Sequence, residues 1–164
     1  MPNEFYFMGL GGLGVSLAGF AGLISALDRR PVAHGAVAGW RIRNIVMGGF
    51  QVTFAGFGTV ALYTVTDKDL TLTVRLASLF LAAMTLAPIP REGRPGPAWP
   101  DDRHRRRAVA FSVALAVAEV ANVAVGSLGY LQVLLLLHLS GPVSIFTRAV
   151  RDVARDDRGP DPSG

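Results

Sequence analysis

The stretch AVAFSVALAVAEVANVAVG, residues 108–126, is nineteen residues long and contains a single ionisable side chain, Glu119. As an α-helix it would rise about 28 Å, close to the roughly 30 Å thickness of the hydrocarbon core of a bilayer. A helix of a soluble protein normally carries a charged face, and this stretch has none. The stretch therefore predicts a membrane-spanning helix with an acid near its middle.

Four more apolar runs of similar length occur in this chain of 164 residues, at residues 5–27, 44–65, 70–89 and 128–146. One such run is also compatible with a core helix of a soluble protein, but five in so short a chain favour an integral membrane protein. We expect an all-α protein in which five transmembrane helices form one bundle over residues 1–150. Residues 151–164 are polar and rich in Asp, Pro and Gly, which predicts a disordered cytoplasmic tail.

The basic side chains are distributed unevenly among the connections between these runs. Fourteen of the sixteen Lys and Arg residues follow the first, third or fifth run. They are Arg29, Arg30, Arg41, Arg43, Arg91, Arg94, Arg103, Arg105, Arg106, Arg107, Arg148, Arg151, Arg155 and Arg158. By the positive-inside rule this side is cytoplasmic, so the N-terminus lies outside and the C-terminus inside. We therefore expect a multi-pass protein of a bacterial inner (plasma) membrane.

The composition also indicates which partners and cofactors to expect. The arginines flank apolar runs, where anionic lipid headgroups are their nearest partners, so we expect the bilayer and no nucleic acid as partner. The lack of cysteine excludes thiolate metal sites. His138 is the only histidine inside an apolar run, and no phosphate-binding glycine loop or HExxH motif is present. We therefore expect no metal and no cofactor.

Small and polar residues recur at helical spacing and predict the faces on which the helices pack, because close approach replaces the hydrophobic effect as the driving force in lipid. In the first run these residues are Gly9, Gly12, Ser16 and Gly19. In the second run they are Asn44, Gly48, Gln51, Ala55 and Gly58. The third run has Thr71, Arg75, Ser78, Ala82 and Thr85, and the fourth has Ala108, Ser112, Glu119, Asn122 and Gly126.

Glu119 lies on such a face, so we expect it to point into the protein. Folding the fourth and fifth runs about the short GSLG turn brings Glu119 near His138, and the opposite lean of their side chains closes the remaining offset. Arg75 is the alternative partner, although its length lets it extend to the membrane surface. We favour the pair Glu119–His138 and keep Arg75 open as its rival. Asn122 and Gln132 are the nearest further polar groups.

Pro142 follows His138 by four residues and cannot donate a hydrogen bond to its carbonyl, which predicts a kink beside the pair. Two interpretations remain open at this point. The carbonyl of His138 is satisfied by Ser140 or water in a simple helix kink, or the region forms a polar cavity or ion path through the bundle.

The function expected from these features is that of a non-enzymatic accessory or scaffold subunit of a membrane assembly, as a homo-oligomer or with a membrane-protein partner. The alternative is a small ion- or proton-coupled transporter or channel, because ionisable groups inside a membrane are often functional. Its path would be formed by Glu119, His138, Arg75, Asn122, Gln132 and Gln51. A membrane enzyme that uses Glu119 and His138 is the third possibility.

Overall fold

The computed structural model describes residues 1–27, 35–94 and 102–156, and all regular secondary structure within these residues is helical. The helices are α1 (Glu4–Leu27), α2 (Gly35–Val65), α3 (Leu70–Leu86), α4 (Ile89–Glu92), α5 (Asp102–Val125) and α6 (Leu128–Asp156). Five segments, in α1, α2, α3 with α4, α5 and α6, are long and apolar enough to cross a membrane. The prediction of an all-helical protein with five candidate membrane-spanning helices is thus confirmed.

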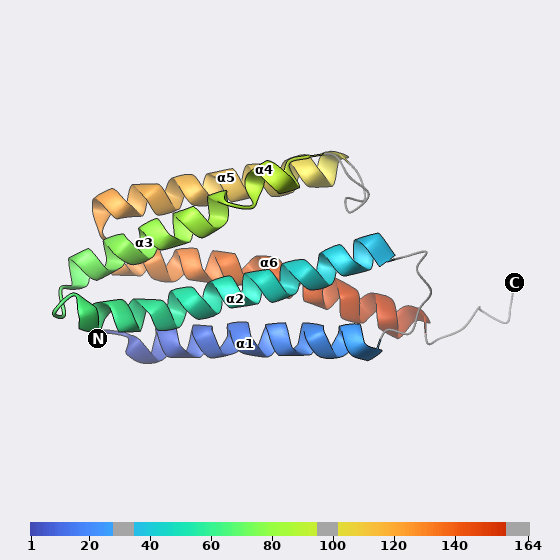
Figure 1. Ribbon diagram of the computed structural model, residues 1–164, viewed down its shortest axis with the longest axis horizontal. Helices are drawn as coiled ribbons and strands as arrows, with labels where there is room; N and C mark the ends of the chain where they lie inside the picture. Colours follow the sequence, from blue (N-terminus) through green and yellow to red (C-terminus); the bar gives the residue numbers. More distant parts are fainter. Residues whose placement is uncertain (28–34, 95–101, 157–164) are drawn as a thin grey trace, which may run out of the picture.

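The five long helices run alternately in opposite directions along one axis (Figure 1). α1 packs along α2, α3 packs along α5, and α6 contacts all four of the other long helices. The N-terminus, the α2–α3 turn and the α5–α6 turn share one end of the bundle, and the starts of α2 and α5 lie at the other (Figure 1). α6 is therefore the helix that joins the two pairs.

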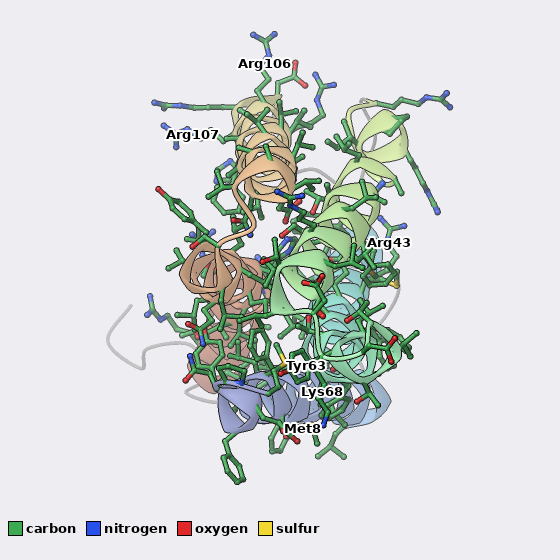
Figure 2. All side chains as sticks on the ribbon, turned by 90° about the vertical axis from the view of Figure 1, so that its left-hand side faces the viewer. Met8, Arg43, Tyr63, Lys68, Arg106 and Arg107 are labelled. Atoms are coloured by element: carbon green, nitrogen blue, oxygen red, sulfur yellow. The ribbon has the colours of Figure 1, made fainter. Side chains whose placement is uncertain are left out.

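Most of the described arginines lie at the end of the bundle where α2 and α5 begin and α6 finishes, and Arg75 is an exception. Those at this end are Arg41, Arg43, Arg91, Arg94, Arg103, Arg105, Arg106, Arg107, Arg148 and Arg151. Seen along the bundle axis, Arg106 and Arg107 point away from the other helices (Figure 2). The turn in which α2 passes into α3 lies at the opposite end of the bundle (Figure 1). The bundle thus has one basic end, as the order of runs and arginines predicts.

Three helix boundaries differ from those predicted. α2 and α5 begin at Gly35 and Asp102, ahead of the apolar runs that start at residues 44 and 108. α6 continues through Asp156, which is the first part of the tail that we expect to be disordered, while residues 157–164 lie outside the described part. The physical reason is that each residue added to an existing helix gains a backbone hydrogen bond, whatever its polarity. Hydropathy marks only the apolar part of such a helix.

The third apolar run is divided by proline. α3 ends at Leu86, and the short helix α4 follows with Pro88 as its N-cap. Pro88 has no N–H to donate to the carbonyl of Met84, four residues earlier. Gln51 of α2 supplies the missing donor, because its Nε2 donates a hydrogen bond to the Met84 carbonyl at 3.2 Å. A side chain on one helix thus completes the backbone hydrogen bonding of the next.

The contact between α1 and α2 is built on glycines that the sequence did not single out. A Cβ atom at Gly14 would lie 2.6 Å from Thr53 Oγ1, and one at Gly56 would lie 3.1 Å from the backbone nitrogen of Gly11. The Thr53 hydroxyl lies within hydrogen-bonding distance of two carbonyls, Gly49 at 2.8 Å and Gly11 at 3.1 Å. The two backbones are therefore as close as they can be without a side chain between them.

The predicted packing face of α1 was wrong. Among the described residues nothing lies within 4 Å of a Cβ placed at Gly9, Gly12 or Gly19, and the exposed Ser16 bonds only back to Gly12 of its own helix. Glycine, alanine and serine are so frequent in α1 that small stripes exist on two faces. The spacing of small residues alone does not show which of these two faces packs against α2. In the structure the packed face is the one that also carries the buried side chains Phe7 and Leu10.

Two of the three small positions on the predicted packing face of α2 lie against other helices or in the core. A Cβ at Gly48 would collide with the ring of Pro142 on α6, and Ala55 is buried in the core. Gly58 is the exception, because nothing described lies within 4 Å of its Cβ position. It borders an open apolar pocket instead of a neighbouring helix.

Candidate functional site

Glu119 and His138 meet inside the bundle, as the sequence analysis favoured. The carboxylate atom Oε1 of Glu119, on α5, is hydrogen-bonded to Nε2 of His138, on α6. Thr85 of α3 completes a cluster of three, with its hydroxyl 3.3 Å from Glu119 Oε1 and 3.3 Å from His138 Nε2. We call Thr85, Glu119 and His138 the acid–base cluster. It connects three helices through their side chains.

The acid–base cluster is enclosed by protein. Glu119 is 0% exposed, Thr85 is 6% exposed and His138 is 9% exposed. A buried polar group without a partner is unfavourable in such surroundings, whereas Glu119 has a hydrogen bond to the imidazole of His138. The pairing therefore makes burial of Glu119 tolerable.

The hydrogen bonding of the cluster is incomplete. The Thr85 hydroxyl has one hydrogen, and its shortest contact is with the Leu81 carbonyl of its own helix, at 2.9 Å. Glu119 Oε1 therefore has His138 as its main donor. The second carboxylate atom, Oε2, is buried and has no hydrogen-bond partner in the described part of the chain. Glu119 thus keeps a free acceptor inside the bundle.

Asn122 forms a second group of bonds, one helical turn from Glu119. Its Nδ2 donates to Ser78 Oγ on α3 at 2.9 Å and to the Ser127 carbonyl at 3.2 Å, while its Oδ1 accepts from the Ser127 backbone at 3.1 Å. Gly126 has a positive φ of 69° in the same turn, a conformation that glycine adopts without strain. Asn122 thereby fixes the turn between α5 and α6, and with it the register that sets Glu119 opposite His138.

The rival partner, Arg75, is bonded elsewhere. Its exposed guanidinium donates to the Ala124 carbonyl at 3.3 Å, in the last turn of α5. A cation is favoured at that position because the carbonyls of a helix C-terminus carry partial negative charge. The preference for His138 over Arg75 as the partner of Glu119 is thus confirmed.

The other predicted path residues do not join the cluster. Gln51 links α2 to α3 through the Met84 carbonyl. Gln132 is half-buried, and its backbone carbonyl accepts a hydrogen bond from the Tyr6 hydroxyl on α1 at 2.8 Å. The structure therefore brings together Glu119 and His138, places Asn122 beside them, and leaves Arg75, Gln51 and Gln132 at separate sites.

Pro142 lies inside α6, which continues past it. The expectation that Ser140 satisfies the freed carbonyl of His138 was wrong, because the Ser140 hydroxyl donates to the Leu137 carbonyl at 2.6 Å. In a helix a serine hydroxyl donates most readily to a carbonyl three or four residues earlier, and the carbonyl of His138 is only two residues before Ser140. The proline ring instead packs against Gly48 of α2.

Thr85 is the member of the cluster that the sequence reasoning did not assign. The spacing placed Thr85 on the polar face of the third run but gave no measure of its depth relative to Glu119. The signal available was that each helix has polar side chains on one face, Ser78 and Thr85 on α3 and Glu119 and Asn122 on α5. Two polar faces inside a bundle are expected to pair, and Ser78 bonds to Asn122 while Thr85 lies beside Glu119.

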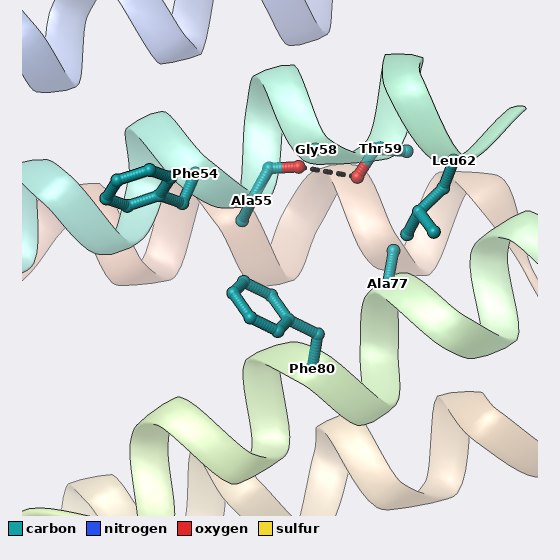
Figure 3. A pocket seen from close by; sticks show the side chains of 7 residues that line it. All are labelled: Phe54, Ala55, Gly58, Thr59, Leu62, Ala77 and Phe80. Carbon is teal, nitrogen blue, oxygen red and sulfur yellow. Dashed lines mark hydrogen bonds between the residues drawn. The ribbon is translucent and has the colours of Figure 1, made fainter. Parts of the chain in front are cut away.

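The described pocket is separate from the acid–base cluster. It lies between α2 and α3, has a volume of about 290 Å³, and is lined by Phe54, Ala55, Gly58, Thr59, Leu62, Ala77 and Phe80 (Figure 3). Its one polar side chain, Thr59, already donates to the Ala55 carbonyl at 2.5 Å. The pocket thus offers an apolar surface and contains none of the ionisable side chains predicted to form a path.

Comparisons with known proteins do not add a functional assignment. No protein-family model, curated protein or solved structure matches this chain. Among the described residues, no group of three or more His, Asp or Glu side chains could hold a metal ion. The polar side chains inside the bundle and the apolar pocket are therefore the features that bear on function.

Proposed function

We propose that this chain is a non-enzymatic subunit or scaffold of a membrane assembly in the bacterial inner membrane. The observation that carries the proposal is that polar side chains within the bundle are used to join helices. Tyr6 links α1 to α6, Gln51 links α2 to α3, Asn122 links α5 to α3, and Glu119 links α5 to α6. The atoms that make these bonds are used to hold helices together, and of these four side chains only Glu119 has a buried polar atom, Oε2, without a partner in the described part of the chain.

A scaffold needs a rigid body and a lateral surface that other membrane components can contact. The polar links supply the rigidity, because a hydrogen bond between helices fixes both their separation and their register. The outer faces carry exposed apolar side chains suited to lipid or to the helices of a partner, among them Phe5, Phe20, Phe54, Val117 and Tyr130. The partner is a second copy of the chain or another membrane protein.

The proposed orientation has the N-terminus outside and the basic end of the bundle in the cytoplasm. The concentration of arginines at that end supports it, since the cytoplasmic side of bacterial membrane proteins is enriched in Lys and Arg. Exposed arginines such as Arg106 and Arg107 would contact anionic headgroups there.

The chain has no cysteine, so its orientation can be tested with single cysteines. We expect Asp67→Cys, in the exposed turn between α2 and α3, to react with an impermeant thiol reagent added outside spheroplasts. Gly96→Cys should react only after the membrane is permeabilised. Labelling of Gly96→Cys from outside, with Asp67→Cys silent, would reverse the proposed orientation.

The scaffold function is tested by two measurements on the full chain. Cross-linking in the native membrane should give a specific adduct with a second copy or with a defined membrane protein, whereas a chain recovered only as a monomer would contradict a scaffold. Purified protein in vesicles should give no proton or ion flux above protein-free vesicles. Flux that disappears in Glu119→Gln would instead establish a carrier.

A further inference from the structure

We propose that the apolar pocket between α2 and α3 binds one acyl chain of a phospholipid, from the leaflet on the side of the α2–α3 turn. A lipid site goes beyond the scaffold function, which does not need a bound lipid. The lining, shape and depth of the pocket carry the assignment, and none of them involves the acid–base cluster.

The pocket exists because small residues face each other across the two helices. Ala55 and Gly58 of α2 lie opposite Ala77 of α3, and nothing described lies within 4 Å of a Cβ placed at Gly58. The helices therefore leave a space of about 290 Å³ between them. Atoms that border an empty space lose dispersion contacts, so an occupant that fills this space is stabilised there.

The lining of the pocket selects an apolar occupant. Thr59 is its one polar side chain, and the single hydrogen of its hydroxyl is donated to the Ala55 carbonyl, the bond drawn in Figure 3. A bound water needs two to four polar partners, and a polar ligand needs a donor or acceptor that is not already used. Hydrocarbon needs neither.

The shape of the pocket fits a single extended chain. Phe54, Gly58 and Leu62 recur every fourth residue along one face of α2, so the pocket extends for about 12 Å along the helix axis. The rings of Phe54 and Phe80 lie at one end and Leu62 with Ala77 at the other (Figure 3). Over this length the volume corresponds to a width of about 5 Å, whereas a helix with its side chains is about 10 Å across. A helix of a partner protein therefore does not enter the pocket.

The position of the pocket indicates which leaflet supplies the chain. Phe54 and Phe80 are both exposed, so the pocket opens on the outer face of the bundle, where acyl chains surround a protein in a membrane. Phe54 lies about 16 Å along α2 from its last residue, Val65, and Leu62 lies closer to that end. One leaflet contributes about 15 Å of hydrocarbon, so a chain of the leaflet beside the α2–α3 turn covers this depth.

The α2–α3 turn determines how the lipid approaches. The hydroxyls of Thr66 and Thr73 are hydrogen-bonded at 2.7 Å and join the two helices beyond the end of the pocket, so the chain enters from the side. Asp67 and Lys68 are exposed in the same turn, which therefore presents both signs of charge. A headgroup with a phosphate and an ammonium, such as phosphatidylethanolamine, is complementary to both.

Photo-cross-linking tests the site on the full chain in vesicles of phosphatidylethanolamine and phosphatidylglycerol. The probe is a phosphatidylethanolamine with a diazirine in the middle of one acyl chain. We expect adducts to concentrate at Phe54 and Phe80. Leu13 on α1 is the internal control, because it is 53% exposed against 58% for Phe54 and lies at a comparable depth. Equal labelling of Leu13 and Phe54 would overturn the proposal, since the chains would then only surround the bundle.

Filling the pocket gives a second, independent measurement. Gly58→Leu should lower the labelling of Phe54 and Phe80 at least about fivefold, because the new side chain occupies the space that the acyl chain needs. Gly12→Leu is the matched control, since its Cβ position is equally open and lies on α1. Neither Cβ meets a neighbouring described atom, so both variants should fold. Unchanged labelling in Gly58→Leu would contradict the site.

A single cysteine distinguishes a lipid from a second copy of the chain at the mouth of the pocket. Gly58→Cys is the only thiol in its chain, because the sequence contains no cysteine. On oxidation in the same vesicles we expect no disulfide-linked dimer, because an acyl chain covers this position. Efficient formation of a dimer would show that a second copy lies against the pocket and would overturn the lipid site.

Discussion

The bundle contains two helix interfaces that are held together in different ways. Between α1 and α2, glycines let two backbones touch, and Thr53 supplies the only described side-chain hydrogen bond. Among α3, α5 and α6, the contacts include an acid, a base and an amide that bond across helices. In lipid both solutions are available, since close packing and hydrogen bonding each replace the hydrophobic effect.

The comparison shows that the two interfaces are stabilised by different kinds of interaction. The described contact between α1 and α2 rests on the close approach of two backbones and on the hydrogen bond from Thr53 to the Gly11 carbonyl. The interface of α3, α5 and α6 contains the bonds of Glu119 with His138 and of Asn122 with Ser78, so its strength also depends on the pairing of polar groups. A substitution at one interface therefore tests a different kind of interaction from a substitution at the other.

The largest expected effect is at the glycine interface. Gly14→Ala places a Cβ within 3.0 Å of the Thr53 backbone nitrogen and closer still to other α2 atoms, so the two helices must separate. We expect the free energy of unfolding in detergent to fall by about 2 to 3 kcal/mol. Gly12→Ala is the control, because nothing described lies near its Cβ position. Equal losses in the two variants would contradict the described face of α1.

Asn122→Ala should have the next largest effect, since it breaks the bond to Ser78 and both bonds to Ser127. We expect a loss of about 1 to 2 kcal/mol in the free energy of unfolding, because the partners are left unsatisfied. Asn44→Ala removes one bond to the Trp40 carbonyl within a single helix and should cost less. A smaller loss for Asn122→Ala than for Asn44→Ala would refute the interhelical role of Asn122.

The pair Glu119–His138 is tested by a double-mutant cycle on the free energy of unfolding. Glu119→Gln and His138→Gln should each destabilise the bundle, and the double variant should cost about 1 kcal/mol less than their sum. Arg75→Gln combined with Glu119→Gln should be additive, because Arg75 bonds to Ala124 instead. If the losses of Glu119→Gln and His138→Gln were additive, the two side chains would not interact.

The smallest effect is expected at the link between the two interfaces. Tyr6→Phe removes the hydroxyl that donates to the Gln132 carbonyl and should lower the free energy of unfolding by about 0.5 kcal/mol. Tyr130→Phe is the matched control, because Tyr130 is 63% exposed and should show no change. If Tyr130→Phe lowered the free energy of unfolding by the same amount, the loss in Tyr6→Phe could not be attributed to the hydrogen bond between α1 and α6.

Much of this arrangement could be predicted from sequence, and the exceptions have physical causes. Hydropathy located the five apolar runs, and the short GSLG turn together with the lean of the side chains favoured His138 over Arg75 as the partner of Glu119. The packing face of α1 was missed because small residues line two of its faces, and only the shape of α2 selects one. The bond from Gln51 to Met84 was not predicted either, since it depends on the relative depth of two helices, which spacing within each helix does not contain.

The bond between Gln51 and the Met84 carbonyl has a consequence for biosynthesis. α2 leaves the ribosome before α3, so the Gln51 amide is made before its partner. The carbonyl that Pro88 releases follows only after another thirty or so residues have been made, roughly a few seconds later at the usual rate of synthesis. The two groups satisfy each other only once both helices lie side by side at matching depth. The bond thus joins a residue made early to a proline made later in the chain, and exchanging either alone would leave the other group without this partner.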